Sequence, residues 1–193
     1  MTKLILICCL ITALVIRING HRSSIFAAAP APSAPAAGDI VADTCKRAAA
    51  GDPDLDYNFC KSLLQSAPGS HKADLRGLAV ISINLAKNNA QRVLGHIRNL
   101  IGEETNNTYR KECLKTCKEV YADAVGELKD SAKSIDSGRI HDARTALSAS
   151  FDAAGTCEDS FSDGNIPSPL AADDDYYQNI GRIALSLAAL LDN

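Results

Sequence analysis

The sequence predicts an all-α protein: an antiparallel four-helix bundle preceded by an N-terminal helical hairpin. Three observations predict this class. None of the seven prolines lies between residues 69 and 166, so long helices can run there without interruption. Apolar residues recur three or four positions apart in four successive segments, which is the periodicity of amphipathic helices. Short turn sequences separate these segments, and short connections place consecutive helices antiparallel.

The four bundle helices are expected at residues 73–101, 109–135, 140–161 and 177–191. Gly, Asn, Asp and Ser residues mark the turns between them. The last helix follows Asp173-Asp174-Asp175, acidic residues that suit a helix N-terminus. A cation site is the alternative for these aspartates, but helix electrostatics accounts for them with fewer assumptions. The preceding hairpin is expected on either side of the turn cluster Gly51-Asp52-Pro53-Asp54.

The N-terminal residues have the pattern of a targeting segment. Lys3 precedes the apolar run Leu4–Ile16, which has the length of a secretory signal and is shorter than the roughly 20 residues of a spanning helix. We predict a signal peptide at residues 1–27, cleaved near Ala27, with an uncleaved membrane anchor as the alternative. Residues 28–38 form a Pro/Ala-rich linker. The folded domain is expected at residues 39–193.

Secretion determines how the cysteines are interpreted. Two of the seven, Cys8 and Cys9, lie in the predicted signal peptide. In an oxidising compartment four of the remaining five should pair and leave one over. A bridge across the Gly51–Asp54 turn would staple the helical hairpin. The remaining cysteines are Cys45, Cys60, Cys113, Cys117 and Cys157.

The residue pattern favours neither nucleic-acid binding nor catalysis. The net charge is −3 and all 23 acidic residues follow position 38, so a basic footprint for phosphates is absent. His71, His96 and His141 lie in no recognisable nucleophile motif, and we expect neither enzymatic activity nor a cofactor. The Cys113-x₃-Cys117 spacing could offer two metal ligands, but zinc usually needs two more, so we predict no metal. Asn106-Asn107-Thr108 is a glycosylation sequon, and we predict Asn106 as the acceptor.

Five short segments resemble the plant invertase and pectin methylesterase inhibitor family, and the resemblance covers residues 39–193. The N-terminal cysteines match as Asp43-Thr44-Cys45 and Tyr57-Asn58-Phe59-Cys60. The segment 117–124 matches the family's Cys-x₃-Tyr-x-Asp-Ala pattern. The segment 149–161 contains its Thr-Cys-Glu-Asp-x-Phe core. Residues 73–82 look most similar to the plane-tree pollen allergen branch, whose members are labelled invertase inhibitors.

The resemblance implies the fold, the cysteine pairing and the function. It implies a four-helix bundle after a helical hairpin, with disulfides Cys45–Cys60 and Cys117–Cys157. Cys113 has no counterpart in the family pattern, so it is either a free thiol or the bridge of a dimer. The implied function is reversible 1:1 inhibition of a plant enzyme by occupation of its active-site cleft. The chain is expected to be secreted to the apoplast, with the vacuole as the alternative.

The target enzyme stays open between pectin methylesterase and acid invertase. One invertase-inhibitor branch carries Pro-Lys-Phe near the third bundle helix, where this chain has Gly138-Arg139-Ile140 and so lacks the proline. Glu158 after Cys157 looks more like the invertase inhibitors. Arg139, Ile140 and His141 are the predicted partner-binding residues, because they offer a base, an apolar anchor and an imidazole at one turn. A secreted structural or signalling bundle without inhibitory activity is the alternative function.

Overall fold

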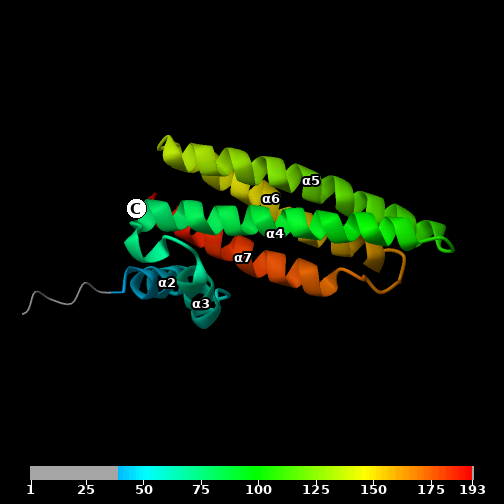
Figure 1. Cartoon of the computed structure of the whole chain (residues 1–193), viewed down its shortest axis with the longest axis horizontal. Coiled ribbons are helices and arrows are strands. Elements are labelled where there is room, and N and C mark those ends of the chain that lie inside the picture. The colour runs from blue at the N-terminus through cyan, green and yellow to red at the C-terminus, as the bar shows by residue number, and fades with distance from the viewer. Residues whose placement is uncertain (1–38, 193) are drawn as a thin grey trace, which may run out of the picture. The chain divides into compact units, whose positions relative to one another are not determined.

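The computed structural model describes residues 39–192, and these consist of helices and their connections. A short helical hairpin comes first and four long helices follow as a bundle (Figure 1). Within these residues there is no strand, and no helix combines the length and the hydropathy needed to cross a membrane. The all-α prediction is therefore confirmed. The expected signal peptide of residues 1–27 and linker of residues 28–38 lie outside the described residues.

The N-terminal hairpin is built from two short helices, α2 (Ile40–Gly51) and α3 (Tyr57–Ser66), followed by the 3-10 helix η1 (Ser70–Lys72). An aspartate occupies the N-cap position before each of these two α-helices. The carboxylates of Asp39 and Asp56 accept hydrogen bonds from backbone N–H groups of the first turn. These caps satisfy donors that have no partner inside the helix. The hairpin therefore forms where the turn residues between the two helices predict it.

A disulfide joins the two helices of the hairpin, and a small apolar core holds the hairpin against the bundle. Cys45 and Cys60 are bonded, with their Cα atoms 5.9 Å apart. Apolar side chains of the hairpin pack against the first helix and the last helix of the bundle. This small core includes Val41, Cys45, Ala48, Leu55, Cys60, Leu64, Leu78, Ala79, Ile183 and Leu187.

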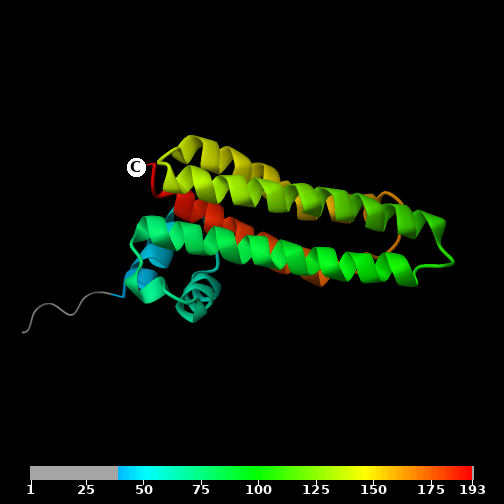
Figure 2. The ribbon, with the colours of Figure 1, turned by 45° about the horizontal axis from the view of Figure 1, so that its top comes forward.

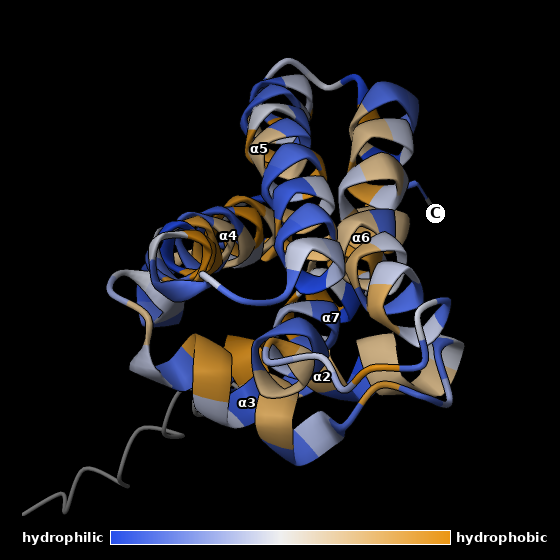
Figure 3. Ribbon diagram, turned by 90° about the vertical axis from the view of Figure 1, so that its right-hand side faces the viewer, coloured by the Kyte–Doolittle hydropathy of each residue, from blue (hydrophilic) through white to orange (hydrophobic). Residues whose placement is uncertain are grey.

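The bundle is an antiparallel ring of four helices. In chain order they are α4 (Leu75–Glu103), α5 (Thr108–Asp136), α6 (Ile140–Ser162) and α7 (Ala171–Ala189). α5 packs between α4 and α6, and α7 closes the ring by packing on the same two helices (Figure 2). Orange apolar segments face the space between the helices, and blue polar segments face outward (Figure 3). The amphipathic pattern in the sequence thus corresponds to the core of the bundle.

Side-chain caps explain where two of the long helices begin. Asp74 accepts a hydrogen bond from the backbone N–H of Gly77 at 2.8 Å, at the start of α4. Asn107 accepts one from the backbone N–H of Arg110 at 2.9 Å, at the start of α5. Both residues supply the short polar side chain that an N-cap position favours.

The last helix starts earlier than the sequence pattern indicates. α7 begins at Ala171, so Asp173, Asp174 and Asp175 lie inside the helix and not before it. Leu170 occupies the N-cap position and makes no side-chain cap bond. Two of the aspartates are in the first turn, as helix electrostatics favours, but their side chains also make tertiary contacts that a capping role does not explain.

Candidate functional site

The turn between α5 and α6 carries the predicted partner-binding residues. Gly138 has φ 74°, a left-handed conformation that glycine adopts without steric cost, and it reverses the chain after α5. Arg139 and His141 are exposed, and Ile140 is partly exposed. The turn lies at one end of the bundle (Figure 1). A guanidinium, an imidazole and part of an apolar side chain are therefore accessible together at this end.

Arg139 is held in place by two side chains. Its Nε donates to Oδ2 of Asp142 at 3.1 Å, and its Nη2 donates to Oγ of Ser134 at 3.3 Å. The ion pair is on the surface, because the side chains of Arg139 and Asp142 are 57% and 60% exposed. Exposed pairs of this kind contribute only about 0–1 kcal/mol. The guanidinium can therefore exchange Asp142 for a carboxylate of a partner at little cost.

Hydrogen bonds between helices stiffen the same end of the bundle. Arg76, near the start of α4, donates through Nη1 to the backbone carbonyl of Ile135, near the end of α5. The buried hydroxyl of Ser131 donates to the backbone carbonyl of Ala143 in α6 at 3.1 Å. The α5–α6 turn is thus fixed to rigid elements, which reduces the ordering cost of binding a partner.

A shallow groove along α5 and α6 was not predicted from the sequence. Three carboxylates line it: Asp123 and Glu127 from α5, and Asp152 from α6. Val120, Ala149 and Thr156 supply other parts of its lining. The signal in the sequence was the acidic residues that flank the apolar stripes of two neighbouring helices. This acidic groove is suited to a basic surface of a partner.

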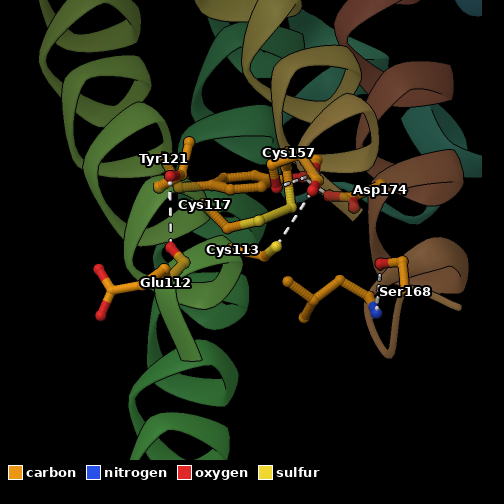
Figure 4. Close-up of a disulfide and its surroundings, with 10 residues drawn as sticks. Glu112, Cys113, Cys117, Tyr121, Cys157, Ser168 and Asp174 are labelled. Atoms are coloured by element: carbon orange, nitrogen blue, oxygen red, sulfur yellow. Dashed lines mark hydrogen bonds between the residues drawn. A yellow bond between two sulfur atoms is a disulfide. The ribbon is translucent and has the colours of Figure 1, made fainter. Parts of the chain in front are cut away.

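The second disulfide joins α5 to α6. Cys117 and Cys157 are bonded, with their Cα atoms 4.6 Å apart (Figure 4). Together with Cys45–Cys60, these are the two pairings that the resemblance implies. Cys113 is the one described cysteine outside the disulfides. It is 4% exposed, and its thiol donates to the backbone carbonyl of Ser160 at 3.0 Å.

Asp173 joins the start of α7 to α4. Its carboxylate contacts Nη1 of Arg92 at 2.9 Å and Nδ1 of His96 at 2.6 Å. Partial burial acts to raise the pKa of Asp173, but the hydrogen bonds from His96 and Arg92 outweigh it and hold that pKa below its usual value. His71, His96 and His141 are all exposed, and His96 contacts the carboxylate of Asp173.

Asp174 points into the protein and is 1% exposed. The hydroxyl of Tyr121 on α5 donates to its Oδ1 (Figure 4). Burial, together with the neighbouring Glu158 carboxyl on α6, raises the pKa of Asp174 to about 8, whereas the Tyr121 hydrogen bond acts in the opposite direction. This cluster was not predicted from the sequence. The sequence feature that could have indicated it is the position of Asp174, three residues before Tyr177, on the continuation of the apolar stripe of α7.

The same cluster is the candidate for a metal site among the described residues. Cys157, Glu158 and Asp174 place one donor atom each within 4.8 Å of one another. The sulfur of Cys157 is already bonded to Cys117, so it is not a thiolate ligand. Two carboxylates remain, fewer than the ligands that zinc or calcium usually takes from a protein. The donor set therefore fits a resident metal poorly.

The predicted glycosylation site lies in the connection between α4 and α5. Asn106 is exposed, and its backbone N–H donates to Oε1 of Glu104 at 3.2 Å. The next residue, Asn107, is the N-cap of α5. An oligosaccharide on Asn106 would extend into solvent without displacing a core residue.

Comparisons with known sequences identify inhibitors of two kinds. A protein of Platanus orientalis named "Putative invertase inhibitor" is 34% identical over 154 residues, which is 79% of this chain and 90% of the relative. The pectinesterase inhibitor of Actinidia deliciosa is 33% identical over 161 residues, which is 83% of this chain and 83% of the relative. The two relatives are thus named for different target enzymes.

A solved structure shows the fold, and a family model shows the relationship. The crystal structure of a mutant form of a pectin methylesterase inhibitor from Arabidopsis matches with a TM-score of 0.63 at 21% identity, over 76% of this chain and 93% of that chain. At this identity the match shows the shared helical fold. The family model for plant invertase/pectin methylesterase inhibitors matches residues 39–187. The chain therefore belongs to the plant invertase/pectin methylesterase inhibitor family.

Proposed function

We propose that this protein is a secreted inhibitor that reversibly occupies the active-site cleft of a plant carbohydrate-active enzyme, either pectin methylesterase or acid invertase. The observation that carries the proposal is the family match over residues 39–187. Relatives named as inhibitors of each enzyme support it. The chain acts in the apoplast or the vacuole, forms a 1:1 complex and has no catalytic activity of its own.

The contact surface follows from the mechanism of a protein that inhibits without reacting. Such an inhibitor must fill or cover the cleft, so it needs a rigid protruding element with side chains complementary to the cleft. Both target enzymes work through carboxylates in their clefts. The turn that holds Arg139, Ile140 and His141 offers a positive charge beside an apolar group. The acidic groove at Asp123, Glu127 and Asp152 complements a basic rim around the cleft.

The decisive experiment is a parallel titration. The purified protein is added in increasing amounts to a fixed concentration of an acid invertase and, separately, of a pectin methylesterase. We expect activity to fall until one inhibitor is present per enzyme molecule, and to recover when the complex is separated. Inhibition of neither enzyme at a large excess would contradict the proposal and favour a structural or signalling role.

Two charge reversals separate the two surfaces. Arg139→Glu changes the turn and Asp123→Lys changes the groove, and both side chains are exposed. The variant on the surface that contacts the enzyme should lose inhibition, while the other should retain it. Loss in neither variant would exclude both surfaces as the main contact.

A further inference from the structure

Two carboxyl groups from different helices meet in the interior where α5, α6 and α7 pack together. Glu158 comes from α6, next to the Cys117–Cys157 disulfide, and Asp174 comes from the first turn of α7. Their closest donor atoms are within 4.8 Å of each other. Oε1 of Glu158 and Oδ2 of Asp174 are both buried, and neither has a hydrogen-bond partner.

The groups around this pair do not neutralise it. α5 contributes the hydroxyl of Tyr121, which binds Oδ1 of Asp174 and leaves Oδ2 unpaired. α7 itself contributes Asp173, a further negative charge near Asp174, and Tyr177, whose phenol is neutral because burial raises its pKa to about 12. Arg92 and His96 of α4 contact Asp173. No ion pair found within residues 39–192 includes Glu158 or Asp174.

Glu158 is partly buried and Asp174 is buried, so two negative carboxylates at this distance, each with one buried oxygen that lacks a partner, would repel each other. A single proton removes the conflict. It converts one carboxylate into a carboxyl, whose O–H can donate to the other oxygen, so both orphaned atoms gain a partner at once. A metal ion would need further ligands that the cluster does not offer. A proton needs none.

We propose that Glu158 and Asp174 hold one proton between them, and that release of this proton weakens the junction of α5, α6 and α7. The pair is then a pH-sensitive device built into the fold, which favours the folded bundle in acidic solution. The pair includes no residue of the α5–α6 turn. The proposal is therefore independent of which enzyme the protein inhibits.

The direction of the pH effect follows from the pKa of Asp174. Burial first, and then the Glu158 carboxyl, raises this pKa from the usual 3.8 to about 8. Between these two values the folded chain binds a proton that the unfolded chain has released. The stabilisation is therefore complete below about pH 4 and is lost as the pH rises toward 8. For one proton, the unfolding equilibrium constant increases by up to about tenfold per pH unit over this range.

The test compares the pH dependence of unfolding in the wild type and in Asp174→Asn. Denaturant unfolding is measured at pH 5, 6, 7 and 8. The unfolding constant of the wild type should rise about 100-fold more than that of the variant between pH 5 and pH 7. Asparagine has the same shape and can donate to Oε1 of Glu158, so the variant should fold. Parallel pH profiles for the two proteins would overturn the proposal.

Two control variants exclude other titrating groups. Asp175→Asn removes an exposed carboxylate from the next position of the same helix and should keep the steep wild-type profile. His96→Gln removes an imidazole, a type of group that ordinarily titrates between pH 5 and pH 8. This variant should also keep the steep wild-type profile. If His96→Gln alone flattens the profile, the histidine and not the carboxyl pair is responsible, and the proposal is wrong.

Two further measurements keep the proposal testable if Asp174→Asn does not fold. Carboxyl ¹³C shifts of the folded wild type should show one aspartate or glutamate still protonated at pH 6, and full ionisation of every carboxyl at that pH would overturn the proposal. Added CaCl₂ or ZnCl₂ at pH 8 should leave the melting temperature unchanged. If either salt raises the melting temperature of the wild type, and Glu158→Gln abolishes this rise, the site binds a metal ion and the proposal is wrong.

Discussion

Tyr121 on α5 and Tyr177 on α7 meet edge to face in the core, with their ring centroids 5.2 Å apart. Their hydroxyl groups bind different helices: Tyr121 donates to Asp174 on α7, and Tyr177 donates to the backbone carbonyl of Ser150 on α6 at 2.9 Å. Burial raises the pKa of Tyr177 to about 12 despite this hydrogen bond, so its hydroxyl stays protonated in neutral solution. Two phenol side chains thus link three helices of the bundle.

The first prediction concerns the hydroxyl of Tyr177. Tyr177→Phe keeps the ring and removes the donor to Ser150, so we expect the free energy of unfolding to fall by about 1 kcal/mol. Denaturant titration at pH 6 measures the change. Tyr176→Phe is the matched control, because the Tyr176 side chain is 40% exposed and loss of its hydroxyl should cost less than about 0.5 kcal/mol. An equal effect in both variants would contradict a specific role for the Tyr177 hydrogen bond.

The second prediction concerns the close approach of α6 and α7 at Gly181. A Cβ atom added at this buried glycine would lie 2.9 Å from Cδ2 of Phe151 on α6. Gly181→Val should therefore destabilise the protein by about 1–3 kcal/mol, because the ring of Phe151 must move. Thermal unfolding provides the measurement.

Gly126 on α5 is the matched control for that substitution. A Cβ added there has no neighbouring atom within 4 Å. Gly126→Ala should stabilise the protein by about 0.5–1 kcal/mol, since alanine favours the helix and restricts the unfolded chain. Destabilisation by Gly126→Ala, or an unchanged melting temperature for Gly181→Val, would disagree with the packing described for these helices.

The third prediction concerns the thiol of Cys113. Because this thiol is buried, iodoacetamide should label it slowly in the folded protein. After unfolding without a reductant, in protein that lacks residues 1–27, one thiol per chain should react. Peptide mapping should place the label on Cys113 and recover Cys45–Cys60 and Cys117–Cys157 as linked peptides. An interchain bridge would require Cys113 to leave its buried position, so a Cys113 disulfide in the peptide map would contradict this assignment.

The helical bundle could be predicted because its pattern is local. Apolar spacing places each stripe on one face, and turn residues such as Gly138 separate the helices. The pairing of the cysteines, in contrast, came from the family motifs. Periodicity places Cys117 and Cys157 on helix faces but does not determine which cysteine lies opposite which. A relationship to known proteins supplied the information that the spacing lacked.

The buried carboxyl pair was hidden for a physical reason. Glu158 and Asp174 are on different helices, and their contact depends on the rotation and the translation of α6 against α7. Small differences in either would turn both side chains toward water. The aspartate triplet was also interpreted through its charge alone, although only a helix that begins at Ala171 directs Asp174 inward. Tertiary packing decided the role of this residue.

The last prediction tests the proposed contact at Arg139. In Arg139→Glu a carboxylate replaces the guanidinium, next to Asp142 and opposite the acidic cleft of the enzyme. Inhibition of an acid invertase should weaken at least tenfold, equivalent to about 1.4 kcal/mol of binding free energy. The fold should be unaffected, because the lost surface pair contributes little to stability. For a pectin methylesterase the effect should be smaller, since the family resemblance implies more contact along the helix faces. Inhibition constants and melting temperatures are measured on the same preparations.

Lys115→Glu is the control that separates a local contact from a change in net charge. Lys115 pairs with Glu112 at 2.7 Å, three residues earlier on α5, and its side chain is 50% exposed, so its surroundings resemble those of Arg139. It lies toward the opposite end of the helix from the turn. The two variants have the same net charge and should have similar stability, but only Arg139→Glu should lose affinity. Equal losses would indicate long-range electrostatics. Full inhibition by Arg139→Glu would exclude the turn as the contact and direct attention to the groove at Asp123 and Asp152.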